Sequence, residues 1–185
     1  MKTFLSDIFP RIQRYSEKLD NLTLLTNKNW LYIDDLMSNN TVYIFRNKSE
    51  LLISTEGNVV RAKWEYLENN SLLIDIKLKS YLFKHGFIDK DILALKKHGK
   101  DEYAIFVNED KYDGELSPNG VFEYLNRKYF GLYQTDKGEI KVEPVLLQIG
   151  NKVLQNKLPV INGKYDLGNQ CFIMVKNGFI VGFKS

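Results

Sequence analysis

The stretch that decides the fold is Val60-Arg61-Ala62-Lys63-Trp64-Glu65-Tyr66. Its apolar residues alternate strictly with Arg61, Lys63 and Glu65. Successive side chains of a β-strand point to opposite faces of the sheet, so a period of two indicates a strand with one dry face and one wet face. We therefore predict a strand here, with Trp64 on the dry face.

The same pattern continues on both sides of this strand. Short apolar runs recur at intervals of about 8–12 residues, a spacing typical of antiparallel sandwiches and barrels rather than of βαβ units. The runs cover residues 30–33, 42–45, 51–54, 59–67, 72–76, 81–83, 92–96 and 103–107. The predicted fold is therefore mainly β, with an antiparallel meander over residues 29–110 that forms a barrel or a strongly curved sheet.

Helices are expected on either side of the meander. Within residues 1–28, apolar residues at helical spacing predict a helix over roughly residues 7–20, with Pro10 in its first turn and room for a bent extension before it. This helix is expected to pack on the meander or to plug it. Residues 119–185 are expected to hold a short helix over 121–129, capped by Asn119, and a small β module.

The C-terminal module has weaker signals than the meander. Its predicted strands cover residues 131–134, 140–142, 145–149, 158–161, 171–176 and 179–183. Asn177-Gly178 is the strongest short hairpin signal of the chain. Whether these strands form a separate domain or extend the meander stays open at this stage.

Composition limits the classes of protein to consider. Hydrophobic residues make up 44% and charged residues 26% of the 185 residues, as in ordinary globular proteins. A net charge of +3 is too small to indicate nucleic-acid binding. The single cysteine, Cys171, excludes an intramolecular disulfide and is expected to be a buried, inert thiol. Asp34 and Asp35 are expected to end the first strand as solvated residues.

The N-terminus lacks a secretory signal, and no segment has the length of a membrane span. We therefore expect a cytoplasmic protein that binds neither nucleic acid nor membranes, and whose oligomeric state the sequence leaves open.

Residues 30–99 carry a resemblance. Thr41-Val42-Tyr43-Ile44-Phe45, the serine-ended run of residues 50–54, Glu56-Gly57 and Lys63-Trp64-Glu65-Tyr66 follow one another, and three further strand patterns come after them. This order of strands, glycine turn and tryptophan resembles bacterial lipocalin-like domains, and implies a β-barrel. The chain as a whole is similar to bacterial proteins of unknown function, which implies no activity.

Catalytic signatures are missing from the sequence. It contains no phosphate-binding glycine loop, nucleophile elbow, paired CxxC or HExxH motif. His85 and His98 are the only histidines and are expected to be exposed in turns, where they hold no metal. We expect no catalytic residue, metal or cofactor, and an enzyme of unrecognised type is the least favoured of three functional hypotheses.

Charge distribution supports the leading hypothesis, a non-catalytic protein-interaction module. Residues 75–100 carry a net charge of +4, and residues 101–115 carry −5. Adjacent blocks of opposite charge can steer a charged partner, although they also suit exposed strands that resist edge pairing. The candidate partner-binding residues are Lys96, Lys97 and Lys100. A toxin-neutralising, immunity-type protein is one specific form of this hypothesis.

The alternative hypothesis is a lipocalin-like barrel that binds a small apolar ligand. Aromatic side chains of the predicted strands would line its interior, namely Tyr43, Phe45, Trp64, Tyr66, Tyr81 and Phe83. A barrel of eight strands either holds one small ligand or is filled by its own side chains. The sequence favours the filled core and leaves the ligand site as a hypothesis.

Overall fold

A computed structural model describes residues 2–33 and 40–184 of the chain. The backbone divides into two compact units, residues 1–118 and residues 119–185, and each has its own sheet. The expectation for Asp34 and Asp35 falls outside the described residues.

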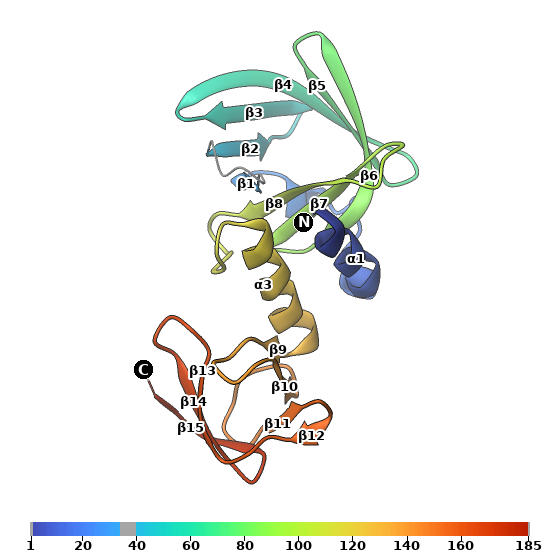
Figure 1. Cartoon of the computed structure of the whole chain (residues 1–185). Coiled ribbons are helices and arrows are strands. Elements are labelled where there is room, and N and C mark those ends of the chain that lie inside the picture. The colour runs from blue at the N-terminus through green and yellow to red at the C-terminus, as the bar shows by residue number, and fades with distance from the viewer. Residues whose placement is uncertain (1, 34–39, 185) are drawn as a thin grey trace. The chain divides into compact units, whose positions relative to one another are not determined.

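Within the described part of the first unit, eight antiparallel strands close into a barrel (Figure 1). The strands are β1 (Trp30–Ile33), β2 (Thr41–Phe45), β3 (Glu50–Thr55), β4 (Asn58–Leu67), β5 (Ser71–Ile76), β6 (Lys79–Ile88), β7 (Ile92–Lys97) and β8 (Tyr103–Asn108). Each strand pairs with the next in the chain, and β1 returns to β8 with Tyr32 opposite Phe106. The predicted mainly β, antiparallel fold is confirmed.

The deciding strand has the predicted two faces. Along β4, Ala62 and Trp64 are buried, whereas Arg61, Lys63 and Glu65 are exposed. The buried residues of β4 join one interior cluster with apolar side chains from the other barrel strands. Trp64 is 6% exposed, so the prediction that it lies on the dry face is confirmed.

The N-terminal segment packs on the wall of the barrel and also contributes to its interior cluster. Helix α1 (Lys2–Ile12) places Phe9 against Phe87 of β6 and Tyr103 of β8, at ring-centroid distances of 6.2 and 4.8 Å. After the 3₁₀ turn η1 (Gln13–Tyr15), helix α2 (Leu22–Leu25) contributes Leu25 to the interior cluster. The helix therefore begins earlier than predicted and ends at Ile12, so Pro10 lies in its last turn rather than in its first.

Helix α3 (Pro118–Phe130) starts at the last residue of the first unit and belongs otherwise to the second, and proline suits its first position. The helix predicted over residues 121–129 is thus confirmed, with Asn119 inside it rather than capping it. Gly131 follows with φ +66° and a Cβ position that the Val142 carbonyl already fills, so glycine is required there.

The remaining strands form the antiparallel sheet of the second unit. They are β9 (Leu132–Tyr133), β10 (Ile140–Glu143), β11 (Lys152–Gln155), β12 (Leu158–Pro159), β13 (Gly163–Asp166), β14 (Phe172–Lys176) and β15 (Phe179–Lys184). The sheet order is β13-β14-β15-β11-β10-β9, with β12 paired to β11. Its core contains Ile140, Val153, Tyr165, Ile173 and Ile180, among others. The predicted Asn177-Gly178 hairpin joins β14 to β15, with positive φ at both turn residues.

Several predictions for this unit were wrong. Residues 145–149 form a loop rather than a strand, because Pro144 has no N–H to continue the ladder. Strands β11 and β13 were missed, since each is only four residues long and carries few apolar side chains. Cys171 is exposed and precedes β14, whose register turns Ile173 and Val175 inward instead.

Candidate functional site

The interior of the barrel is occupied by its own side chains. Of the predicted ligand-binding residues, Phe45 and Trp64 are buried and meet edge to face, with ring centroids 5.7 Å apart. Tyr66 and Phe83 are half-buried and pack against the same interior cluster. These four residues therefore belong to the core of the barrel. Their packing favours a barrel interior that is filled by its own side chains.

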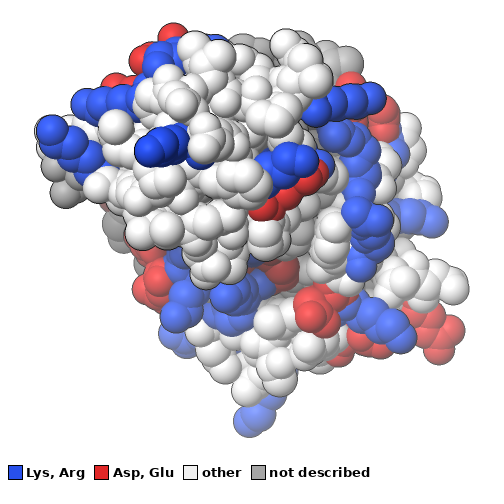
Figure 2. Space-filling view, turned by 90° about the horizontal axis from the view of Figure 1, so that it is seen from below, with Lys and Arg blue, Asp and Glu red and all other residues white. Residues whose placement is uncertain are grey.

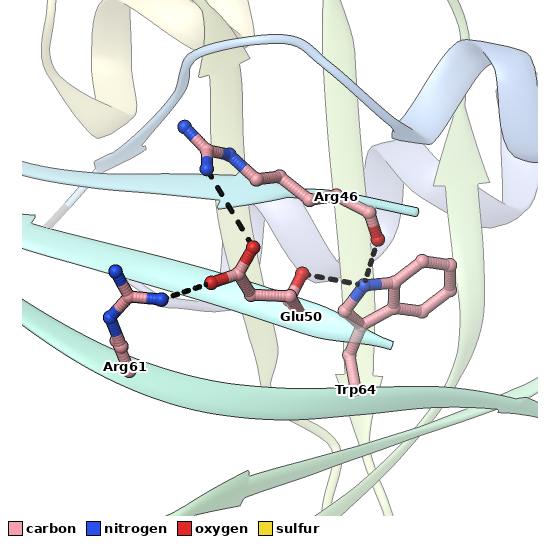
Figure 3. Close-up of polar contacts among 4 residues, drawn as sticks. All are labelled: Arg46, Glu50, Arg61 and Trp64. Atoms are coloured by element: carbon pink, nitrogen blue, oxygen red, sulfur yellow. Dashed lines mark hydrogen bonds and ion pairs between the residues drawn. The ribbon is translucent and has the colours of Figure 1, made fainter. Parts of the chain in front are cut away.

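Polar contacts fix Trp64 at the turn between β2 and β3 (Figure 3). Its indole N–H donates to the carbonyl oxygens of Arg46 and Glu50, at 2.9 and 3.0 Å. The Glu50 carboxylate in turn accepts a hydrogen bond from Arg61 at 2.7 Å and lies 3.6 Å from Arg46. Trp64 thus anchors the turn by binding two of the turn's backbone carbonyls, and the Glu50 carboxylate contacts the guanidinium groups of Arg46 and Arg61.

The barrel wall splits beside β4. Residues 58–62 of β4 pair with β3, whereas pairing with β5 begins only at Lys63. The hairpin between β5 and β6 therefore projects past the end of the β4–β5 ladder, and Leu78 at its tip is fully exposed. This split leaves a concavity on each side of the wall.

The hollow on the inner side of the split has a volume of about 540 Å³. It is lined by Thr41, Tyr43, Ile53, Thr55, Val60, Ile76, Lys77, Leu78, Lys79 and Tyr81. Two of the predicted ligand-binding residues, Tyr43 and Tyr81, therefore meet at this opening rather than deep in the barrel. Aliphatic side chains form its wall, and hydroxyl and ammonium groups provide polar contacts, a combination that suits a small amphipathic molecule.

The phenol of Tyr43, which lines this hollow, has a raised pKa. Burial raises the pKa of its phenol, and the neighbouring phenols of Tyr32 and Tyr81 raise that pKa further. No described residue forms a hydrogen bond with the hydroxyl of Tyr43 or Tyr81. The Tyr43 hydroxyl therefore stays neutral at physiological pH and can donate a hydrogen bond to a bound molecule.

The groove on the outer side is larger and more polar, with a volume of about 990 Å³. It is lined by Asn47, Lys48, Ser49, Glu50, Arg61, Ala62, Lys63, Asp75, Lys77, Leu78 and Ser80. Glu50 is engaged by arginines, and one carboxylate oxygen of Asp75 is buried without a described hydrogen-bond partner. The groove offers opposite charges side by side and no histidine for proton transfer.

The predicted partner-binding lysines lie in and beside the β7–β8 hairpin. The Nζ atom of Lys96 lies 2.7 Å from Asp101, and that of Lys97 lies 2.9 Å from Glu102. The hydrogen bond to Glu102 raises the pKa of the Lys97 ammonium. Lys100 is exposed in the turn between them. The end of the basic block and the start of the acidic block thus face each other across one hairpin, so Lys96 and Lys97 have acidic partners within the chain.

A surface that the sequence analysis missed lies on the second unit. Of the fourteen large apolar side chains that are exposed among the described residues, eight belong to residues 119–185. They are Leu146, Ile149, Leu158, Ile161, Met174, Phe179, Val181 and Phe183, and we call them the exposed apolar set. The run Phe179-Ile180-Val181 could have indicated this surface in the sequence, because a strand with apolar residues on both faces is usually covered on both faces.

The described residues provide little for metal or thiol chemistry. Among them, no three histidine, cysteine or acidic side chains are grouped in a way that could hold a metal ion. His85 lies within β6 rather than in a turn, and Ser16 contacts its ring. In the described part of the chain, no helix combines the length and the apolar character needed to span a membrane.

Comparison with known proteins adds no relative. No protein-family model matches the chain, and no curated protein or solved structure is significantly similar to it.

Proposed function

We propose that this chain is a non-catalytic protein-binding module, and that its docking surface lies on the second unit. The observation that carries this proposal is the concentration of exposed apolar side chains in a unit of 67 residues. Large apolar side chains gathered on a surface mark sites of association, because water is expelled from them on contact. A toxin-neutralising, immunity-type role is one specific form, since such proteins act by binding alone.

The arrangement of strands brings part of the exposed apolar set together. A Cβ at Gly178 would lie 2.8 Å from the Pro159 Cβ, so Leu158 lies near the β14–β15 turn. The amide of Gly150 donates to the Ile180 carbonyl at 2.7 Å, which places Ile149 beside β15. Phe179, Val181 and Phe183 are each about half exposed. Covering the exposed half of such a side chain contributes on the order of 1 kcal/mol.

A site-specific photo-crosslinking experiment tests the proposal. A photoreactive phenylalanine analogue is placed at Phe179, at Phe183 and, as a matched control, at Leu78, which is exposed on the other unit. Irradiation of cells that make the protein is expected to give one discrete protein adduct from the first two positions and none from Leu78. The proposal is wrong if none of the three positions gives an adduct, or if only Leu78 does.

A second candidate function, favoured by the hollow beside the barrel split, is binding of a small amphipathic molecule. Tyr43 and Tyr81 would contact its polar end, and Ile53, Val60 and Ile76 its apolar body. Proton NMR of the tyrosine rings during titration with a panel of fatty acids and aromatic carboxylates tests it. Ligand-dependent shifts at Tyr43 that Tyr43→Phe weakens support this candidate, whereas an unchanged spectrum across the panel argues against it.

A further inference from the structure

Strand β15 has an incompletely paired edge. It pairs with β14 from Phe179 to Lys184, with a register shift that leaves Val181 without a partner on β14, and β11 reaches its other side only at Phe179. Backbone hydrogen bonds from residues 150 and 151 extend this second contact to Ile180. Among the described residues, none pairs with the outer edge of residues 181–184. A strand edge of this kind offers unused N–H and C=O groups to another chain.

The opposite end of the sheet is protected. The Asp166 amide of β13 donates to Asp136 Oδ1 at 2.9 Å, and the Asp166 carbonyl accepts from the Asp136 amide. The Nζ atom of Lys137 also donates to the Lys164 carbonyl at 2.7 Å. The β9–β10 loop therefore satisfies polar groups along β13. The end of β15 lacks such cover among the described residues.

Side chains at the end of β15 are suited to hold an added strand. Val181 and Phe183 are 52% and 48% exposed. Lys184 is the only charged residue of β15. Ile149, which is 66% exposed, lies beside this end through the Gly150–Ile180 hydrogen bond. An extended segment placed along residues 181–184 would therefore meet apolar side chains as well as free backbone groups.

The charge around this edge selects the partner. Residues 119–185 contain nine basic and five acidic residues, a net charge of +4, whereas residues 1–118 carry −1. Lys184 follows Phe183 at this edge, whereas Lys176, opposite Phe179, and Lys157, before Leu158, lie toward the β14–β15 turn. None of these three lysines forms an ion pair with a described residue. Figure 2 shows a broad surface of uncharged side chains with both basic and acidic side chains around it.

We infer that residues 181–184 of β15 accept an extended, acidic segment of a partner protein as an added β-strand. The inference rests on the proposed function and specifies how the partner is recognised. Backbone groups of β15 hydrogen-bond the segment, Val181 and Phe183 contact its apolar side chains, and Lys184 attracts its carboxylates. A second copy of this chain fits less well, because both copies would bring a unit of net charge +4.

Short synthetic peptides test this inference on the full-length protein. The probe is a peptide of about eight residues in which glutamate alternates with valine, long enough for one strand. One control replaces every glutamate with lysine, and another keeps the side chains but methylates alternate backbone nitrogens. NMR hydrogen exchange of the ¹⁵N-labelled protein is expected to show slower exchange in residues 181–184 with the glutamate peptide only.

Single charge reversals provide a matched control within the chain. Lys184→Glu is expected to weaken binding of the glutamate peptide by roughly two- to fivefold, the effect of one exposed ion pair. Lys96→Glu makes the same change of charge on the first unit and is expected to leave that affinity unchanged. In about 1 M salt, where the Debye length is ~3 Å, the effect of Lys184→Glu is expected to fade.

The outcomes separate this inference from the proposed function. Equal binding of the lysine peptide would overturn the acidic partner, and equal binding of the N-methylated peptide would overturn the added strand. No change at residues 181–184 with the glutamate peptide at millimolar concentration would overturn both parts. Crosslinks at Phe179 alongside any of these results would leave the proposed function standing. Concentration-dependent dimerisation through β15, or binding to anionic phospholipid vesicles instead of peptide, would also overturn the inference.

Discussion

Ser16 and His85 link the N-terminal segment to the barrel wall: the Ser16 Oγ lies 3.0 Å from the His85 Nε2. The same Oγ accepts a hydrogen bond from the Ile88 amide at 2.9 Å, and the Glu17 amide donates to the Ile88 carbonyl at 2.8 Å. These contacts lie on either side of the irregularity in β6, where pairing with β7 shifts between His85 and Phe87. His85 is therefore a structural residue of the first unit.

Stability should depend on pH through His85. Burial lowers the pKa of its imidazole, so the unfolded chain, whose histidine pKa is about 6.5, binds a proton more tightly. The contribution of neutral His85 to the free energy of unfolding is thus complete above about pH 6.5 and is lost as pH falls toward the lower folded pKa.

Urea unfolding at pH 7.5 and pH 5.5 measures this effect. His85→Gln is expected to reduce the loss of stability between the two pH values, whereas the control His98→Gln keeps it. An identical pH dependence in all three proteins would contradict this assignment.

Gly86 lies at the bulge in β6, where the pairing with β7 shifts, and Gly182 of β15 serves as its control. A Cβ at Gly86 would lie 2.6 Å from the Tyr103 ring and 2.7 Å from the Ala94 carbonyl oxygen, whereas a Cβ at Gly182 meets nothing within 4 Å. Gly86→Ala should therefore cost about 1–3 kcal/mol by overpacking. Gly182→Ala should change the free energy of unfolding by less than about 1 kcal/mol. Chemical denaturation of both variants decides, and equal costs would show that the bulge tolerates a side chain.

Trp64 should stabilise the β2–β3 turn from a distance in sequence. Trp64→Phe keeps an aromatic ring but removes the N–H that the Arg46 and Glu50 carbonyls share, at a cost of about 1–3 kcal/mol. Hydrogen exchange should quicken in residues 46–50. Trp30→Phe, which removes a bond to the Leu25 carbonyl instead, is the control and should leave exchange in that turn unchanged. Equal acceleration in both variants would argue against a local role for Trp64.

The ion pair of Lys97 and Glu102 should add little to stability. Their side chains are 41% and 35% exposed, so water screens the attraction. A double-mutant cycle with Lys97→Ala and Glu102→Ala is expected to give a coupling energy of about 0.2–1 kcal/mol that shrinks in high salt. A coupling well above that range would mean that the hairpin charges are structural rather than available to a partner.

The barrel was predictable because its signals are local. β4 alternates strictly, the other strands appear as short apolar runs, and turn residues separate them, so these patterns predict the order of pairing. The start of helix α1 depended on the balance between Pro10, which disfavours the turn before it, and the apolar face of Ile8 and Ile12, and sequence alone does not decide that balance. In the second unit, β11 and β13 gain their pairing from distant strands, and four residues hold too little pattern to reveal that.

The candidate sites were harder to predict than the fold. Alternation placed Phe45 and Trp64 in the interior, but whether a side chain fills the barrel or lines a hollow depends on where β4 parts from β5. The lysines of the β7–β8 hairpin looked unpaired along the sequence, yet the turn brings Asp101 and Glu102 to them. The exposed end of β15 depends on the pairing of β11, which reaches β15 only at Phe179, and the sequence does not reveal that pairing.

Closure of the barrel has a consequence for the folding reaction. Seven of the eight strand pairs join neighbours in the described chain, whereas the β1–β8 pair joins Trp30 to Asn108 and must wait for the whole meander. Loop-closure entropy makes such a distant pairing the slow step of barrel formation. Tyr32 meets Phe106 only when this pair forms, so the fluorescence of these rings should report the last step of folding.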